Sequence, residues 1–157
     1  LLDPLGLQRP DVWITDCLDL YHASKGNAGR VSDTYEPLVG QLANSGHPLP
    51  HASLLQHPSE SEIVRLAVGH HIPRLEREIQ VCAPRRIITL GNAALRVVRH
   101  LAGAAHDVPK RLKADSSYGQ AIHIEVAGRG VELLPLAHPA APKQYQQAHR
   151  DWLLGVS

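Results

Sequence analysis

The hydrophobic and polar residues of the chain fall into short apolar runs and longer stretches with helical spacing. Four short runs predict strands, because each is apolar or alternating and is bounded by turn-forming or charged residues. These runs are residues 12–15, 86–90, 122–126 and 131–136. The first is apolar and rich in β-branched residues, so a buried strand is expected there. Residues 127–130 (AGRG) join the last two runs and predict a hairpin.

Apolar residues three or four positions apart predict helices between these runs. Ser59 and Glu62 form a capping box, and a helix is expected from there to about residue 69. Pro73 starts the next helix and Pro84 ends it. The buried stripe of this second helix is expected to be Leu75, Ile79 and Cys82. Two more helices are predicted over residues 93–102, after a turn at 91–92, and over residues 142–154.

Other segments carry too many turn-forming residues for a regular element. Residues 21–30 are polar with two glycines and are expected to form a loop. Residues 37–58 hold four prolines, two glycines and three histidines, which predicts a long surface loop with a short helix over 38–43. Residues 1–7 are expected to end a helix that Gly6 stops. Because strands alternate with helices, the chain is predicted to be an α/β fold with a mainly parallel sheet.

The composition fits one soluble globular domain. Of the 157 residues, 43% are hydrophobic and 20% are charged, which excludes a disordered, fibrous or disulfide-rich chain. No apolar run approaches the ~20 residues that a membrane helix needs. A net charge of +1 does not by itself indicate a nucleic-acid binder, but it allows a local basic face. Since the sequence contains no Met, we expect it to be a fragment of a longer chain.

Cysteine and histidine bear on metal binding and on the cellular compartment. Cys17 and Cys82 have apolar neighbours in the sequence and are expected to be reduced core thiols of a cytoplasmic protein. Two cysteines alone cannot build a structural zinc or iron–sulfur site. The chain has 11 histidines, several of them over residues 47–71. Their spacing fits no tight ligand motif, so no metal is expected.

The ends of the predicted strands carry a family resemblance. Ligands of open α/β sheets bind beyond the carboxyl ends of the strands, and three such ends are informative here. These ends are residues 14–16, 89–92 and 136–139. Four segments around them are informative: residues 1–15 (LLDPLGLQRPDVWIT), 73–79 (PRLEREI), 84–91 (PRRIITLG) and 134–140 (LPLAHPA). In their order and spacing they resemble the uracil-DNA glycosylase superfamily, most closely its iron–sulfur-containing bacterial branch. The last segment resembles the family's His-Pro-Ser motif; residues 56–59 (QHPS) match its letters better but follow a proline-rich loop rather than a strand.

The chain departs from the family pattern at several points. The family's first motif, which positions the attacking water, belongs to an earlier strand than any in this sequence. Asp16 stands at the base-reading position, where the family has Asn. Leu20 and His71 stand where two cluster cysteines of the branch would be. We therefore expect neither an iron–sulfur cluster nor any other cofactor.

The resemblance implies roles for His138 and Asp16 as catalytic residues. A glycosylase takes a base out of the stack and cleaves its bond to the sugar, so a donor aimed at a base carbonyl stabilises the leaving anion. His138 is the candidate for that donor. An ionised Asp16 only accepts hydrogen bonds, so it would prefer an amino group to a carbonyl. Alternatively, Asp16 is protonated, activates the water, or caps a turn.

Other residues at the same strand ends are candidates for contact with the base or with DNA. They are Thr15, Gly91, Asn92, Pro139 and Lys143. Asn92 is expected to cap the helix after Gly91, whose start could also attract a phosphate. Lys143, together with Lys110, Arg111 and Lys113, could contact phosphates. In the family, the segment after His138 inserts a wedge into DNA. Here this segment carries small side chains, which favours single-stranded or damaged DNA as the substrate.

The resemblance implies a single domain over residues 1–157, a three-layer α/β/α sandwich that lacks its first strand and motif. It implies a DNA N-glycosylase that removes uracil or a related damaged or deaminated base in DNA repair. The alternative is a non-catalytic nucleic-acid-binding or interaction module that kept the fold. A third possibility is an enzyme acting on free nucleosides or nucleotides. No membrane partner is expected, and the sequence does not indicate an oligomeric state.

Overall fold

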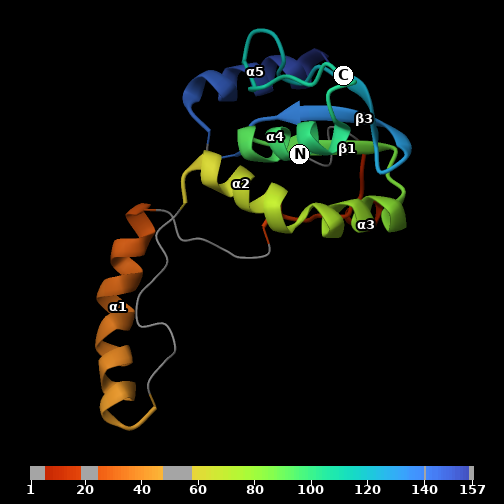
Figure 1. Ribbon diagram of the computed structural model, residues 1–157. Coiled ribbons are helices and arrows are strands. Elements are labelled where there is room, and N and C mark those ends of the chain that lie inside the picture. The colour runs from red at the N-terminus through yellow and green to blue at the C-terminus, as the bar shows by residue number, and fades with distance from the viewer. Residues whose placement is uncertain (1–5, 19–24, 48–57, 140, 156–157) are drawn as a thin grey trace. The chain divides into compact units, whose positions relative to one another are not determined.

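A computed structural model describes residues 6–18, 25–47, 58–139 and 141–155 (Figure 1). The chain divides into two compact units, one formed by residues 1–18 and 60–157 and the other by residues 19–59. The larger unit contains the sheet and the candidate site. Among the described residues, no helix combines the length and apolar character needed to cross a membrane.

The sheet of the larger unit has three strands with the order β1-β3-β2. They are β1 (Arg86–Leu90), β2 (Ile122–Val126) and β3 (Arg129–Leu136), which confirms three predicted strands, the last starting two residues earlier. β1 and β3 are parallel, whereas β2 and β3 are antiparallel. The sheet is therefore mixed rather than mainly parallel. The reason is the predicted hairpin itself, since its two-residue turn at Ala127 and Gly128, both with positive φ, forces antiparallel pairing.

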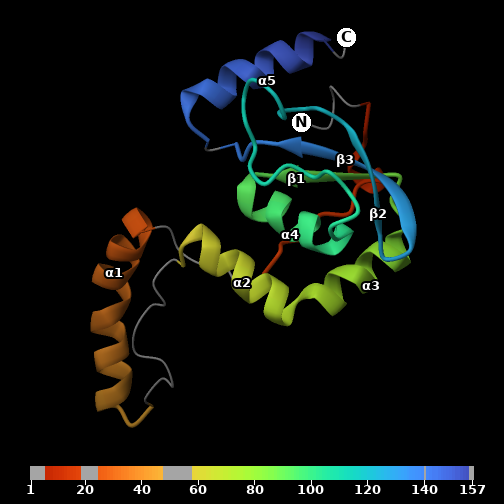
Figure 2. The same cartoon turned by 45° about the horizontal axis from the view of Figure 1, so that its top comes forward.

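Helices cover both faces of this sheet. Figures 1 and 2 show α5 (Lys143–Gly155) on one face and α4 (Asn92–Ala102) on the other, with α2 (Glu60–His70) and α3 (Ile72–Cys82) beyond α4. Five of the last six residues of β3 are buried, as expected of a central strand covered on both sides. A second apolar cluster joins α2, α3 and α4 through Ala67, Leu75 and Val97. The α/β class and four predicted helices are thus confirmed.

The first predicted strand is not formed. Residues 12–16 follow a short 3-10 helix, η2 (Arg9–Asp11), without regular secondary structure. Trp13 and Ile14 are each 65% exposed. The expectation of a buried strand was wrong because a short apolar run indicates burial only where another strand or helix covers it.

The smaller unit contains a helix where loops were expected. α1 (Lys25–Asn44) passes through Pro37 and includes the short helix predicted over 38–43. The loop predictions were therefore wrong over residues 25–30 and at Pro37 and Asn44, whereas the short helix predicted over 38–43 is confirmed as part of a longer one. Glycine and proline lower helix propensity, by about 1 and 3 kcal/mol respectively, but they do not always end a helix. Parts of the predicted elements lie outside the described residues, namely residues 1–5, 21–24 and 48–57. Gly6, expected to end the first helix, has a positive φ of 66°, which is common at helix ends.

Cys82 differs from its expected place in the buried stripe of α3. Leu75 is buried and Ile79 packs against the main core, but Cys82 is exposed. Cys82 is the last residue of the helix, and Ala83 follows it in the left-handed conformation with φ +44°. The chain therefore turns away at Cys82, which no longer faces the core.

The loop between α4 and β2 is fastened to β3 and α5 at Gly119. Its N–H donates to the Pro135 carbonyl at 2.9 Å, and its φ is +65°. A Cβ at this position would overlap the indole ring of Trp152 on α5. The loop therefore packs this closely on α5 only because residue 119 has no side chain.

This packing predicts a large loss of stability for Gly119→Ala. Gly128→Ala is the matched control, because Gly128 also has positive φ (+74°) but nothing lies within 4 Å of a Cβ there. The control should cost about 1–2 kcal/mol for the left-handed backbone, and Gly119→Ala about 1–3 kcal/mol more for the overlap. Urea unfolding of both variants measures the difference; equal losses would contradict the packing argument.

Candidate active site

The carboxyl ends of β1 and β3 place two of the predicted site segments side by side. The parallel register pairs Leu90 with Leu136, and the Gly91 N–H donates to the Leu136 carbonyl at 2.8 Å. A Cβ on Gly91 would lie 3.6 Å from the Cβ of His138. Gly91 itself has φ +93°, a conformation that glycine adopts without strain. The structure thus brings His138 next to Gly91 at the edge where α/β sheets bind ligands.

A tight turn carries the chain from His138 into α5. The Ala141 N–H donates to the His138 carbonyl at 2.8 Å, which closes the turn over residues 138–141. His138 and Pro139 are both exposed, and so is Lys143, the first residue of α5. The three side chains are therefore accessible at one end of the sheet.

Asn92 has a different role from the cap that was expected. Gly91 occupies the N-cap position of α4 without a side-chain cap, and Asn92 is the first residue of the helix. The Asn92 Oδ1 accepts a hydrogen bond from the Leu112 N–H at 2.8 Å. The carbonyl of Leu112 accepts another from the Tyr145 hydroxyl, also at 2.8 Å. Asn92 therefore binds the loop between α4 and β2. Its amide oxygen accepts from a backbone N–H twenty residues away instead of from one in its own helix.

Leu112 is buried at the centre of the basic segment of that loop. Lys110, Arg111 and Lys113 beside it are exposed. The hydrogen bonds of Leu112 to Asn92 and Tyr145 connect this segment to the two helices that follow Gly91 and His138. Three basic side chains are thus carried by a loop anchored to both site helices.

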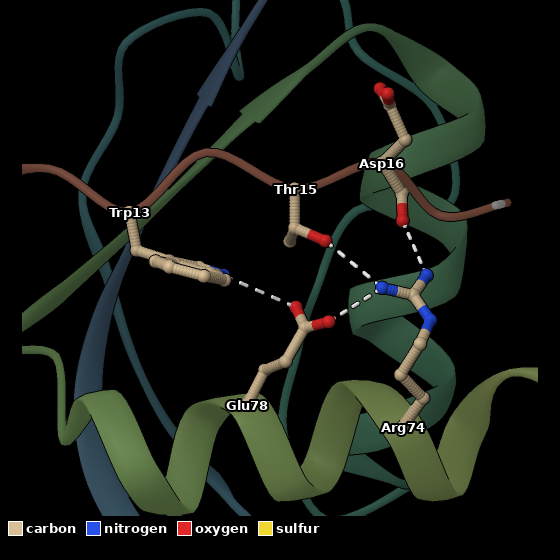
Figure 3. Close-up of polar contacts among 5 residues, drawn as sticks. All are labelled: Trp13, Thr15, Asp16, Arg74 and Glu78. Atoms are coloured by element: carbon tan, nitrogen blue, oxygen red, sulfur yellow. Dashed lines mark hydrogen bonds and ion pairs between the residues drawn. The ribbon is translucent and has the colours of Figure 1, made fainter.

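Thr15 and Asp16 are held by a separate anchor on α3. The Arg74 guanidinium donates through Nη1 to Thr15 Oγ1 at 3.0 Å and through Nη2 to the Asp16 carbonyl at 2.6 Å. Figure 3 shows the Asp16 carboxylate directed away from the guanidinium. Arg74 therefore fixes the backbone of Asp16 but not its carboxylate.

Glu78, one turn further along α3, completes this anchor. Its carboxylate accepts from Arg74 Nη1 at 2.6 Å and from the Trp13 indole N–H at 3.3 Å (Figure 3). Burial raises the pKa of Glu78, but hydrogen bonds from Thr15, Arg74 and Trp13 and the positive charge of Arg74 outweigh it and hold the pKa below 4.5. We call Arg74 and Glu78 the α3 clamp.

Sequence reasoning missed the α3 clamp. The only signal was the spacing of Arg74 and Glu78, four residues apart on a predicted helix. Such pairs occur commonly on solvent-exposed helix faces, so the spacing cannot show that they bind a distant segment.

The residues do not fit the iron–sulfur cluster of the similar bacterial branch. Such a cluster is held mainly by cysteine thiolates, whereas Leu20 and His71 stand at two of the ligand positions of that branch. Cys17 is half-buried and Cys82 is exposed; His71, at one substituted ligand position, precedes α3, and Leu20 lies outside the described residues. Burial, followed by the charge of Asp16, raises the pKa of Cys17 to about 11, which disfavours its thiolate. No group of three or more metal-ligating side chains occurs in the part of the chain that the structure describes.

The α3 clamp predicts an acid-dependent contribution to stability. The pKa of Glu78 in the folded protein lies below its ordinary value of 4.5. The ionised Glu78 therefore adds to the free energy of unfolding above pH 4.5, and this stabilisation is lost as the pH falls through the folded pKa. Glu78→Gln should therefore be less stable than the wild type at neutral pH, with the gap closing below pH 4.5. Thermal unfolding against pH tests this, with Glu76→Gln on the same helix as control; a gap that does not change with pH would refute it.

One family model matches nearly the whole chain. The family model described as "Uracil DNA glycosylase superfamily" matches residues 2–155. No curated protein and no solved structure matches the chain. The matched range includes the strand ends that carry Gly91 and His138 and the segment held by the α3 clamp. Since the match spans nearly the whole sequence, the chain belongs to the uracil DNA glycosylase superfamily.

Proposed function

We propose that the protein is a DNA glycosylase that hydrolyses the N-glycosidic bond of uracil or a related damaged or deaminated base. Membership of the superfamily supports the reaction class. The observation that carries the assignment to residues is the contact between Gly91 and His138 at the carboxyl edge of the sheet. A base bound beyond that edge would lie over the end of β1 with His138 beside it.

His138 acts on the leaving base. As the glycosidic bond breaks, negative charge develops on the base and is spread onto its carbonyl oxygen. A donor already placed at that oxygen lowers the barrier without reorganisation. His138 is exposed, follows a buried strand and accepts a backbone hydrogen bond from Ala141, so its backbone is held at the edge where a base would bind.

Asp16 determines which base is accepted. An asparagine can accept from uracil N3–H and donate to O4, whereas a carboxylate can only accept. The Asp16 carboxylate points away from Arg74 and is exposed, so it is available to a base. A carboxylate there favours a base that presents an amino group. If Asp16 activates the water instead, its replacement abolishes release of every base.

The DNA backbone is bound by the basic residues around this edge. Lys143 starts α5 directly after the His138 turn, and the loop bearing Lys110, Arg111 and Lys113 is anchored to α4 and α5 at Leu112. Such contacts position DNA without reading its sequence. Because residues 139–142 carry no large apolar side chain, single-stranded or already opened DNA is the proposed substrate.

The role of His138 is tested by single-turnover base release from single-stranded DNA carrying uracil, hypoxanthine or xanthine. His138→Ala should lower the rate by about 10²–10³ with unchanged folding, as removal of one oxyanion-type donor does. His123→Ala, an exposed histidine on β2, is the control and should retain the rate. An unchanged rate in His138→Ala would refute the assignment. Binding of DNA without release of any base would favour the non-catalytic alternative.

The role of Asp16 is tested with the same three substrates and with 5-hydroxycytosine, a damaged base that keeps its amino group. Asp16→Asn should raise the release of uracil relative to that of 5-hydroxycytosine, because the amide donates to O4 while still accepting from N3–H. Asp107→Asn, an exposed aspartate outside the site, is the control. Unchanged base preference would exclude Asp16 as the specificity residue, and loss of all release would assign it to water activation.

A further inference from the structure

We propose that Arg74 is the positioning residue that fixes the Thr15–Asp16 segment, so that base preference depends on a side chain of α3 acting through Asp16. The inference rests on the proposed function for its enzymatic consequence. The contacts in Figure 3 carry its structural part. Arg74 is not a catalytic residue here, since its guanidinium contacts the backbone and side chain of the segment.

Cys17 and Leu18, which follow the segment, pack on the apolar cluster of α2, α3 and α4, but residues 13–16 themselves have little else to hold them. Residues 12–16 form no strand with β1, so no ladder of hydrogen bonds fixes them. Trp13 and Ile14 are mostly exposed and supply little hydrophobic anchoring. In the described part of the chain, the polar contacts from residues 13–16 to other elements end on Arg74 or Glu78. The α3 clamp therefore replaces the sheet as the support of this segment.

The shape of the arginine suits this task. Its planar guanidinium reaches Thr15 Oγ1, the Asp16 carbonyl and Glu78 Oε1 through two Nη groups. The side chain of Arg74 is 33% exposed and that of Glu78 is 21% exposed, so the ion pair is partly shielded from water. Arg74 Nε is buried without a hydrogen-bond partner among the described residues, so the two Nη groups make all these bonds. A lysine has one nitrogen and lacks the rigid fork that binds both ends of the segment.

Loss of the α3 clamp would change the preference between bases more than the rate of bond cleavage itself. His138 is held by β3 and its own turn, independently of the clamp. Of the two proposed catalytic residues, only Asp16 has its backbone held by Arg74, and its carboxylate is placed through that backbone. A defect in the clamp therefore changes the ratio of rates between bases, which a general loss of stability would not do.

The experiment compares Arg74→Lys, Arg74→Gln and the wild type in a Cys82→Ser background. Arg77→Gln is the matched control, because Arg77 is an exposed arginine of the same helix. The first readout is the ratio of kcat/KM for uracil and 5-hydroxycytosine in single-stranded DNA, two bases that differ in having a carbonyl or an amino group at the same ring position. The second is the rate at which iodoacetamide alkylates Cys17, which adjoins Asp16 and reports release of the segment without any enzymatic activity. Thermal unfolding confirms that each variant is folded at the assay temperature.

Both Arg74 variants should change the base ratio by about tenfold, as expected for loss of a charged hydrogen bond. Both should also alkylate faster at Cys17, although loss of the Arg74 charge alone would raise the pKa of Cys17 and slow the reaction. Arg77→Gln should match the wild type in both readouts. An unchanged base ratio in an active, folded Arg74→Lys protein overturns the inference and leaves the proposed function intact.

If the wild type releases no base, the proposed function fails, and alkylation alone decides the structural part. Faster alkylation in both Arg74 variants then supports the positioning role, and unchanged alkylation overturns it. If Arg74→Gln does not fold, Arg74→Lys carries the same two readouts. These outcomes separate failure of the clamp from failure of the enzyme assignment.

Discussion

The parallel pairing of β1 with β3 is the interaction on which the site depends. It joins two segments more than forty residues apart and brings their carboxyl ends to one edge. The Gly91 N–H bonded to the Leu136 carbonyl extends this pairing one residue past the strands. β3 can occupy the central position because its side chains are apolar on both faces and helices cover both. Burial of this one strand therefore fixes the place of His138.

The two halves of the candidate site are supported by different forces. The His138 half is held by the sheet and by apolar packing, which involve many weak contacts and change little with pH. The Asp16 half is held by a few charged hydrogen bonds from the α3 clamp. Each of these bonds is stronger than a neutral hydrogen bond, but all of them depend on Arg74 and on the ionised form of Glu78. Asp16, the residue proposed to select the base, is thus held by fewer interactions than His138.

Asn92 and Leu112 show how the same edge is connected to the basic loop. One amide oxygen and one backbone N–H fasten the loop to α4, and the Tyr145 hydroxyl fastens it to α5. Both helices begin where the candidate site segments end. The proposed DNA-contacting loop is therefore joined to the proposed base site through one buried residue, Leu112.

The sequence by itself determined the features that depend on neighbouring residues. The strands over 86–90 and 122–126, the hairpin and the four helices of the larger unit follow from local periodicity, proline positions and turn residues. The His138 motif could also be located, since a strand, a turn and a helix surround it. Tertiary structure decided what depends on distant partners. Residues 12–15 have the composition of a strand but pair with no strand of the described structure. Arg74 and Glu78 have the spacing of an ordinary surface pair, and their contact with Thr15 and Asp16 exists only because folding brings together residues nearly sixty positions apart.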